Sequence, residues 1–288
     1  MRAGLTVVIA VYNREKEIGR CLDSIGAQTV RPTQVIVVDD GSSDASAEVA
    51  RSHHAVTSVL EQPHGGAAAA RNTGLAAVET EWVMFFDSDD VMAPDHVESA
   101  LSGASEDVDI VGWDIERVML DGSRRVNFFE PKNIEWHNLM HGTMATQRYM
   151  ARTKLVRDAG CWNPRALIWN DIELGSRILK FKPRVVKVPG CRVTVYESAK
   201  SITGLSWKEN IEKYKVTLGL VAETLGPERE EWIALKTAIL AADVWREDKV
   251  AGRTLYQGIA RKSFKVRLGY LYRRLGGRGY ARIVGFRF

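Results

Sequence analysis

Apolar runs and amphipathic segments alternate along the first 110 residues of the chain. Short continuous runs rich in β-branched residues predict strands buried on both faces, and apolar positions three or four residues apart predict helices between them. Strands are predicted at residues 5–11, 34–38, 56–60, 81–86 and 108–113, and helices at 15–27, 44–52, 66–78 and 94–101. This alternation predicts an α/β fold with a doubly wound, mostly parallel sheet.

The pattern loosens after residue 115. Asp121-Gly122 predicts a hairpin turn. Helices are expected at residues 153–160 and 171–179, and one or two strands around Pro189-Gly190 within residues 184–196. From residue 207 onward the chain is predicted to be mostly helical, with breaks near Gly226-Pro227 and Gly276-Gly277. We therefore expect one domain over residues 1–203 and a helical extension over residues 204–288.

Three of the predicted strands end in polar residues, at 12–14 (Y-N-R), 39–42 (D-D-G-S) and 87–90 (D-S-D-D). Ligands of parallel sheets bind beyond the carboxyl ends of the strands, so we expect the three clusters to converge on one crevice.

The third cluster is the most acidic. Asp87 and Asp89 can both face one hard cation, and Mg²⁺ or Mn²⁺ takes its other ligands from water and substrate phosphates. The alternative is an acidic turn at the start of the next helix, with Asp90 or Asp95 near that start. We expect metal–phosphate binding by Asp87 and Asp89, and a helix-start role for Asp90.

Other motifs allow both a chemical and a structural interpretation. A carboxylate at 39–40 can bind a nucleobase or ribose, or shape a tight turn. Two glycines at the start of the Ala-rich helix at 66–78 let a ligand approach the backbone, and Arg71 can pair with phosphate. The helix can equally pack on the sheet, with Arg71 in a surface ion pair. Asp171 can be a general base or part of an ordinary acidic first turn.

Composition narrows the class of protein. The chain is 45% apolar and 26% charged, as in soluble globular proteins. Three cysteines without C-x-x-C spacing argue against a disulfide framework or zinc knuckle and fit a reducing compartment. No apolar run approaches the ~20 residues that span a bilayer, and the start of the chain does not resemble a signal peptide. The absence of G-x-G-x-x-G and of G-x-x-x-x-G-K-[ST] counts against nicotinamide, flavin and P-loop sites.

Charge is unevenly distributed. Residues 249–288 contain 11 Lys or Arg and no acidic residue, although the whole chain carries only +4. Residues 261–275 mix basic and apolar side chains, which favours an anionic membrane surface as partner. A helical extension that packs on the core or forms homo-oligomers is the alternative. Nucleic acid is not expected, because a basic patch alone specifies little.

The motifs V-V-I-A-V-Y-N-R-E, V-V-D-D-G-S-S-D, G-G-A-A-A-A-R-N-T-G, F-F-D-S-D-D and W-N-D-I-E-L occur in this order. Together they resemble the family 2 glycosyltransferases over about residues 4–180. The resemblance implies a GT-A fold and an inverting, metal-dependent glycosyltransferase.

The resemblance also implies residue roles. Val11, Tyr12 and Asp40 would contact the nucleobase end of the donor, and Arg71 the nucleotide. Asp87, with Ser88, would lie near the ribose and metal. Asp89 would be the main ligand of Mn²⁺ or Mg²⁺, and Asp171 the base that deprotonates the acceptor hydroxyl. The chain departs from the usual family pattern at three positions, Ala10, His64 and Asn170.

Acceptor contacts are expected from aromatic and polar residues around Asp171. Trp162 and Trp169 flank it and can stack on a sugar, or anchor the core. Asn170 precedes it, and Gln147 and Arg148 are further acceptor-side candidates.

The expected function is transfer of a sugar from a nucleoside diphosphate sugar, UDP-sugar favoured, to a glycan or lipid-linked acceptor in polysaccharide biosynthesis. The expected location is the cytoplasm, peripheral to the inner face of the cell membrane. Two rival functions are a sugar-phosphate nucleotidyltransferase and a non-catalytic nucleotide-sugar-binding subunit. The chain lacks the Gly-rich basic loop that nucleotidyltransferases usually carry after the first strand, which disfavours the first rival. A non-catalytic subunit would not need Asp89 and Asp171, which disfavours the second.

Overall fold

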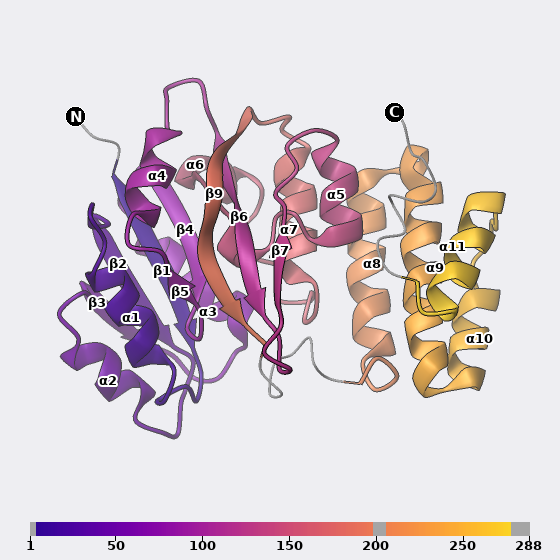
Figure 1. Cartoon of the computed structure of the whole chain (residues 1–288), viewed down its shortest axis with the longest axis horizontal. Coiled ribbons are helices and arrows are strands. Elements are labelled where there is room, and N and C mark those ends of the chain that lie inside the picture. Colours follow the sequence, from indigo (N-terminus) through magenta and orange to yellow (C-terminus); the bar gives the residue numbers. More distant parts are fainter. Residues whose placement is uncertain (1–3, 198–205, 278–288) are drawn as a thin grey trace.

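The computed structural model describes residues 4–197 and 206–277. A twisted sheet lies between layers of helices, and further helices stack at one end of the molecule (Figure 1). The strands are β1 Leu5–Val11, β2 Gln34–Asp39, β3 Ser58–Glu61, β4 Trp82–Asp87, β5 Val91–Met92, β6 Ile110–Val118, β7 Arg124–Asn127, β8 Tyr149–Arg152 and β9 Val185–Tyr196.

The helices cover the sheet and continue beyond it. They are α1 Ile18–Gly26, α2 Ser46–Ser52, α3 Ala67–Ala76, α4 His96–Ser102, α5 Ile134–His141, α6 Thr153–Asp158, α7 Asn170–Leu179, α8 Ile211–Leu225, α9 Glu230–Glu247, α10 Lys249–Gln257 and α11 Phe264–Arg274, with short 3₁₀ turns η1 Thr146–Arg148 and η3 Pro227–Arg229.

The sheet order is β3-β2-β1-β4-β8-β6-β9-β5, with β7 beside β6. Strands β3, β2, β1 and β4 are parallel, and their registers place Val11 beside Asp39 and Ala10 beside Asp87. The polar ends of these strands are therefore neighbours. The predicted α/β class and the convergence of the three polar clusters are confirmed.

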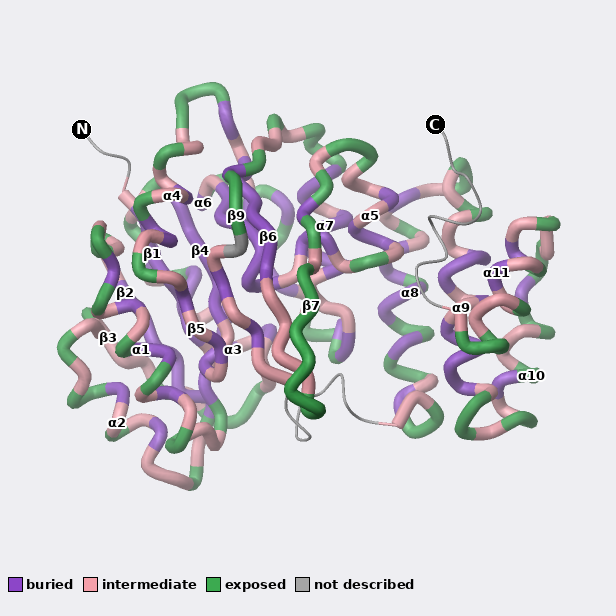
Figure 2. Tube along the Cα trace, viewed as in Figure 1, coloured by how far each residue is buried: buried purple, intermediate pink, exposed green. Residues whose placement is uncertain are grey.

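Two hydrophobic layers hold the helices on the sheet. One face of the sheet packs with α1, α2 and α4, and the opposite face packs with α3, α6 and α7. Because both faces are covered, the central strands are buried along most of their length (Figure 2). This explains why they read as continuous apolar runs and not as alternating ones.

The second half of the sheet is mixed rather than mostly parallel. β8 is antiparallel to both β4 and β6 and separates them, whereas β6 and β9 are parallel. β9 is one strand through Pro189-Gly190, with register shifts opposite residues 112–115. Asp90 does not start a helix: it precedes β5, and α4 begins six residues later. That expectation was wrong because a short edge strand intervenes.

The C-terminal helices pack on the domain through two apolar clusters. α8 and α9 contact α5 and α7 through residues such as Leu139, Ile172 and Leu218, and α9 and α11 contact Trp136. The expected domain boundary at residues 203–204 lies outside the described residues. No helix within residues 4–197 and 206–277 is long and apolar enough to cross a bilayer.

Candidate active site

The carboxylates at the end of β4 and in the turn after it lie in one charged cluster. Asp87 accepts a hydrogen bond from Nη2 of Arg71 at 2.8 Å and another from Nε2 of Gln147. The same Nε2 donates to Oδ2 of Asp90 at 2.7 Å, and the backbone N–H of Tyr196 donates to Oδ1 of Asp90 at 3.1 Å. Asp90 is thus a buried structural acceptor, and Gln147, predicted on the acceptor side, bridges two carboxylates.

Asp89 differs from its two neighbours because it is the least engaged. Its carboxylate pairs only loosely with Arg14, whose Nε lies 3.8 Å from Oδ2, and its side chain keeps 24% of its exposure, whereas its backbone carbonyl accepts from Nη2 of Arg20 at 2.7 Å. Burial, followed by the charge of Asp87, raises the pKa of Asp89. Burial and the charges of Asp87 and Asp89 raise the pKa of Asp90 well above its ordinary value. The cluster therefore holds excess negative charge that a cation would neutralise.

Arg71, on α3, contacts this cluster through Asp87. It is only 7% exposed, its guanidinium lies 4.5 Å from the ring centre of Trp162, and Nε and Nη1 have no hydrogen-bond partner among the described residues. Unpaired buried donors are costly, so they favour a ligand that supplies acceptors. A guanidinium with unpaired donors is able to pair with an anion such as a diphosphate.

The ends of β1 and β2 form the other side of the site. Asp40 is buried and accepts from the backbone N–H groups of Gly65 and Gly66 at 2.9 and 2.8 Å, and from Gln62 and His64. Its carboxylate therefore ties the loop before α3 to β2. This one side chain joins the V-V-D-D-G-S-S-D motif, which contains it, to the G-G-A-A-A-A-R-N-T-G motif.

Tyr12, which is predicted to contact the nucleobase, packs against the ring of His64. Tyr12 is 44% exposed and stacks on His64 with ring centres 4.1 Å apart. Asp39, for which the sequence left a nucleotide-binding and a tight-turn role open, is buried at the end of β2 opposite Val11, and its Oδ1 has no hydrogen-bond partner among the described residues. An aromatic platform next to an unpaired acceptor suits a planar base with N–H groups. Val11 is buried at the end of β1, and Ser88 at the turn after β4.

Asp171, from the second half of the chain, lies within electrostatic range of Arg71 and Asp87. It lies in the first turn of α7, half-buried, and its Oδ1 accepts from the N–H of Ile172 at 2.8 Å. Burial raises its pKa, with the cation of Arg71 opposing and the carboxylate of Asp87 adding to the shift. Residues far apart in sequence thus act electrostatically on one another.

The predicted acceptor residues separate into two groups. Trp162 is 1% exposed, beneath Arg71 and against Phe85, so the structure fits the alternative of a core anchor. Arg148 is also buried; it donates to two backbone carbonyls, and burial lowers its pKa to about 10. Trp169 and Asn170 are half-buried at the start of α7 and stay acceptor candidates.

Lys236 of α9 was not expected near the site. Its ammonium lies 4.3 Å from the ring centre of Trp169 and donates to the carbonyl of Met140 at 3.2 Å. The signal in the sequence is one Lys inside the apolar helical stretch W-I-A-L-K-T-A-I-L. A lysine at a core-facing helical position indicates a buried charge with partners.

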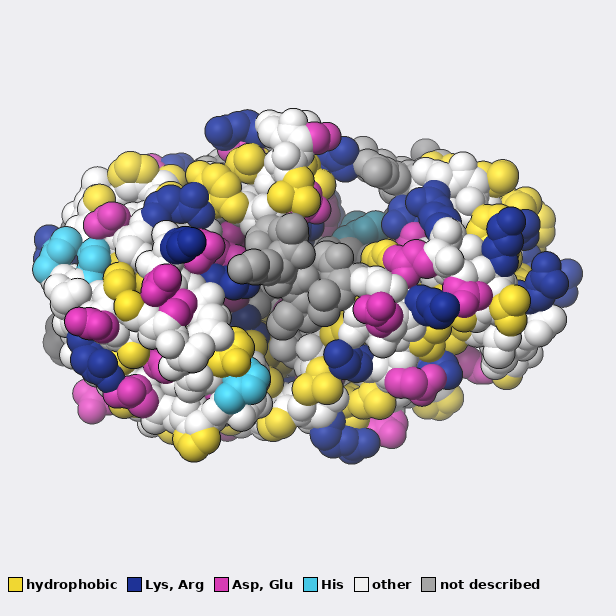
Figure 3. Space-filling view, turned by 90° about the horizontal axis from the view of Figure 1, so that it is seen from below, with side chains coloured by type: hydrophobic (Ala, Val, Ile, Leu, Met, Phe, Trp, Pro, Cys, Tyr) yellow, Lys and Arg dark blue, Asp and Glu magenta, His cyan; other side chains and the backbone are white. Residues whose placement is uncertain are grey.

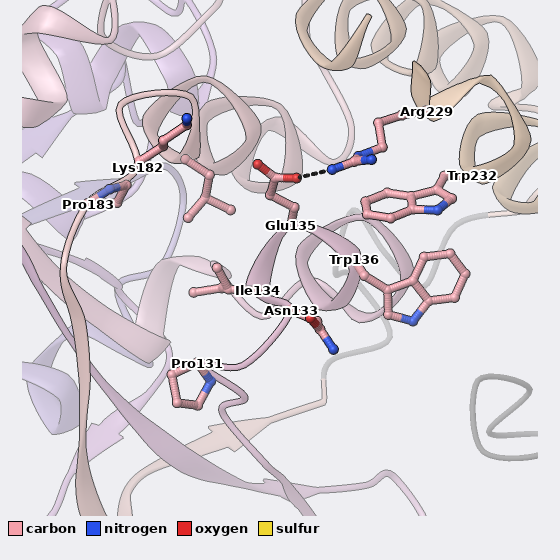
Figure 4. A pocket seen from close by; sticks show the side chains of 10 residues that line it. Pro131, Asn133, Ile134, Glu135, Trp136, Lys182, Pro183, Arg229 and Trp232 are labelled. Carbon is pink, nitrogen blue, oxygen red and sulfur yellow. Dashed lines mark hydrogen bonds and ion pairs between the residues drawn. The ribbon is translucent and has the colours of Figure 1, made fainter. Parts of the chain in front are cut away.

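A separate cavity of about 430 Å³ lies at the opposite end of α7, where Leu179 is part of its wall. Glu135 and Arg229 form an ion pair across it, with Trp232 and Trp136 alongside (Figure 4). It is lined by Pro131, Asn133, Ile134, Glu135, Trp136, Leu179, Lys182, Pro183, Arg229 and Trp232. None of the site residues named above lines it.

Comparison with known proteins gives a consistent result. The model of the family described as Glycosyl transferase family 2 matches residues 6–167. Glycosyltransferase GlyA of Streptococcus pneumoniae is 42% identical over 99 residues, which are 33% of this chain and 14% of that protein. The succinoglycan biosynthesis protein ExoW of Rhizobium meliloti is 44% identical over 105 residues, 34% of this chain and 33% of that protein. The matched part thus spans a third or less of each of these relatives.

Solved structures resemble nearly the whole chain. S. aureus TarS 1–349 in complex with UDP-GlcNAc has a TM-score of 0.65 at 17% identity, covering 96% of this chain and 93% of that one. The mannosyltransferase PcManGT of Pyrobaculum calidifontis, in complex with GDP-Man and Mn²⁺, has a TM-score of 0.61 at 17% identity, covering 98% and 83%. At this identity, the likeness shows a shared fold.

Proposed function

The chain belongs to glycosyl transferase family 2, is a glycosyltransferase and has the GT-A fold, and on this premise we propose its reaction. It transfers a sugar from a nucleoside diphosphate sugar to an acceptor hydroxyl and inverts the anomeric carbon. The observation that supports it is that Arg71, whose buried nitrogens Nε and Nη1 have no hydrogen-bond partner among the described residues, pairs with Asp87 at the carboxyl ends of β1 and β4, within electrostatic range of Asp171.

Donor binding uses the two sides of the site. Tyr12 and His64 stack on the nucleobase, and the free oxygen of Asp39 accepts one of its N–H groups. Asp40 holds the loop that faces the nucleotide, and Arg71 pairs with the diphosphate. Solved neighbours bound to UDP-GlcNAc and GDP-Man support a nucleotide-sugar donor, and UDP-sugar is the donor we propose.

A divalent cation fits the acidic turn. Asp89 is an available oxygen ligand, with Asp87 beside it, and no group of three or more His, Cys, Asp or Glu in the described parts of the chain could hold a metal alone. Water and the diphosphate would complete the shell of Mn²⁺ or Mg²⁺. When bound, the ion would neutralise charge that builds on the leaving diphosphate.

The chemical step is an in-line displacement. Asp171 accepts the proton of the acceptor hydroxyl, and the oxygen forms a bond to the anomeric carbon. The bond from that carbon to the diphosphate oxygen breaks, and the diphosphate leaves with the electron pair. Attack opposite the leaving group inverts the configuration. Arg71 compensates the charge of the diphosphate, and general-base assistance typically contributes ~10²–10⁴-fold.

The test combines a donor screen with a base variant. Sugar nucleotides are assayed with Mn²⁺ for thermal stabilisation and for transfer to hydroxyl acceptors. Asp171→Asn should lower turnover by roughly 10²–10⁴-fold while donor affinity stays within about twofold. Full transfer by Asp171→Asn would overturn the base assignment, and no transfer from any donor would overturn the proposed reaction.

The acceptor we propose is a glycan or lipid-linked glycan. A relative named for succinoglycan biosynthesis supports polysaccharide assembly. The surface of α11 supports a nearby membrane: Phe264, Leu271 and Leu275 are 78, 49 and 79% exposed and share one helical face with exposed Arg267 and Arg274. Lys, Arg and apolar side chains lie among acidic and uncharged ones over this end of the molecule in Figure 3.

Vesicle flotation tests the membrane surface. Truncation before α10 would uncover Leu235 and Trp136, which pack with Val266, so point variants are the sharper probe. Phe264→Gln with Leu271→Gln should abolish recovery with phosphatidylglycerol vesicles, and Leu120→Gln, at another exposed leucine, should not. Equal recovery of both variants, or equal binding to phosphatidylcholine, would contradict an anionic membrane partner.

A further inference from the structure

The helical extension contacts the segment that precedes Asp171. Oγ1 of Thr217 on α8 donates to the carbonyl of Ile168 at 2.7 Å. The ring of Trp169 lies 4.4 Å from that of Tyr214, also on α8. Trp169 caps α7 with φ of +56°, a left-handed conformation that non-glycine residues adopt only when their surroundings hold them. The start of the base helix is therefore fixed from outside the sheet domain.

Lys236 is the charged residue of the extension that contacts this segment, at Trp169. It is 7% exposed on α9, and its ammonium lies 4.3 Å from the ring centre of Trp169. Its one hydrogen bond within the described residues goes to the carbonyl of Met140, on α5, at 3.2 Å. Burial lowers the pKa of Lys236 to about 8, and the carboxylates of Asp171 and Asp243 oppose that shift. The ammonium thus lies within electrostatic range of the proposed base.

Burial of an ammonium group costs free energy unless hydrogen bonds and opposite charges compensate it. An apolar residue of similar length on α9 would pack against Trp169 without the desolvation cost. The cationic face contact with indole and the attraction to carboxylates recover part of that cost. A purely structural helix contact would not require a charge here.

We propose that Lys236 is a positioning residue for catalysis: its ammonium fixes Trp169 at the start of α7 and favours the ionised carboxylate of Asp171. The inference rests on the proposed function, because it assigns a role toward the proposed base. It also gives the extension a part in the reaction. The catalytic constellation is then complete only when α9 is packed on the sheet domain.

Several charged and titratable groups act on Asp171, and the test must isolate one of them. They are Arg71 on α3, Asp87 on β4, Arg148 on η1, Tyr149 on β8 and Lys236 on α9. Only Lys236 belongs to the extension. Its removal should therefore weaken the ionised form of Asp171 and leave the donor side of the site unchanged.

The experiment compares Lys236→Met, Lys236→Gln and Lys236→Arg in the full chain. Lys215→Met is the matched control, because Lys215 is an exposed lysine of the extension paired with Glu212. Turnover against pH at saturating donor, donor affinity by calorimetry and the melting temperature are measured. The two neutral variants should move the acid limb of turnover up by about one pH unit, whereas the Arg and control variants keep it.

The outcomes separate the inference from the proposed function. If Lys236→Met does not fold, Lys236→Gln, which retains N–H donors, carries the test. An unchanged acid limb in a folded neutral variant, or a loss of turnover equal at every pH, would overturn the positioning role. If wild type transfers sugar but Asp171→Asn does so equally well, it is the base assignment that fails.

Discussion

Three carboxylates within four residues are a costly choice for a turn. Asp87 and Asp90 each have polar partners, yet the charges still raise the pKa values of Asp89 and Asp90. A turn that served only geometry would be more stable with amides in these positions. The retained charge at Asp89, which has the weakest contacts, is what favours a cation-binding role.

Asp89→Asn should therefore act on metal-dependent donor binding. The loss of one oxygen ligand should weaken donor affinity in Mn²⁺ by at least about tenfold, with little change in melting temperature. Titration calorimetry with and without Mn²⁺ measures this. Asp158→Asn, at an exposed aspartate of α6 that pairs with Lys154, is the control. Unchanged affinity in the Asp89 variant would exclude it as the main ligand.

The raised pKa of Asp171 sets the pH dependence of turnover. Only its ionised form accepts a proton, so turnover should fall as pH falls through the folded pKa, which burial places above the ordinary 3.8. For stability the sign is opposite: a raised folded pKa favours the protonated native state, and this contribution is lost as pH rises through it. Pre-steady-state turnover and melting curves against pH, compared with Asp171→Asn, measure both. A limb at the ordinary aspartate value would contradict the assignment.

Single residues were predictable where sequence order reflects spatial order. Asp39, Asp87 and Tyr12 end adjacent parallel strands, so topology alone brought them together. Lys236 and the bridging role of Gln147 depend on how distant helices and turns pack, and no local pattern encodes that. Asp90 was misassigned because the short edge strand β5 separates it from α4 and leaves it buried.

At the scale of elements, the apolar runs predicted β1, β2 and β4 well. β8 was missed because four residues, Y-M-A-R, carry little period, and its antiparallel pairing between β4 and β6 is a tertiary property. β9 crosses Pro189-Gly190 because a register shift in its pairing with β6 absorbs the irregularity. Close packing of α3 on the sheet is a further element-scale feature with a testable consequence.

Two helical glycines give a matched pair for that packing. A Cβ on Gly74 of α3 would lie 2.4 Å from Cγ1 of Val8 and 3.2 Å from Cγ2 of Val38, whereas one on Gly19 of α1 would meet nothing closer than 4.0 Å. Gly74→Ala should cost about 1–3 kcal/mol through overpacking. Gly19→Ala should stabilise by about 0.5–1 kcal/mol through helix propensity. Urea unfolding measures both.

The two glycine variants can also fail informatively. If Gly74→Ala is as stable as Gly19→Ala, α3 can move off β1 at little cost. Arg71 would then not be rigidly placed by this helix, and its two unpaired nitrogens would not mark a preformed anion site.

At the scale of the whole molecule, the extension shares its core with the sheet domain. Leu139 and Ile172, from α5 and α7, lie in the same apolar cluster as Leu218 and Leu240 from α8 and α9. The sequence predicted a helical extension but not this contact, because periodicity shows which face of a helix is apolar and not what covers it. A shared core predicts that both parts unfold together.

Scanning calorimetry should therefore give one endotherm for the chain, with calorimetric and van't Hoff enthalpies in agreement. A nucleotide sugar with Mn²⁺, at 100 times its dissociation constant, should raise the temperature of that endotherm as a whole. This corresponds to an increase of ~2.7 kcal/mol in the free energy of unfolding. Leu235→Ala removes a buried contact of α9 in the cluster around Trp136. It should lower the free energy of unfolding by about 2–5 kcal/mol and shift the same endotherm to a lower temperature. Two endotherms, of which the donor raises one and Leu235→Ala lowers the other, would make the extension an independent unit and remove the physical link between α9 and Asp171.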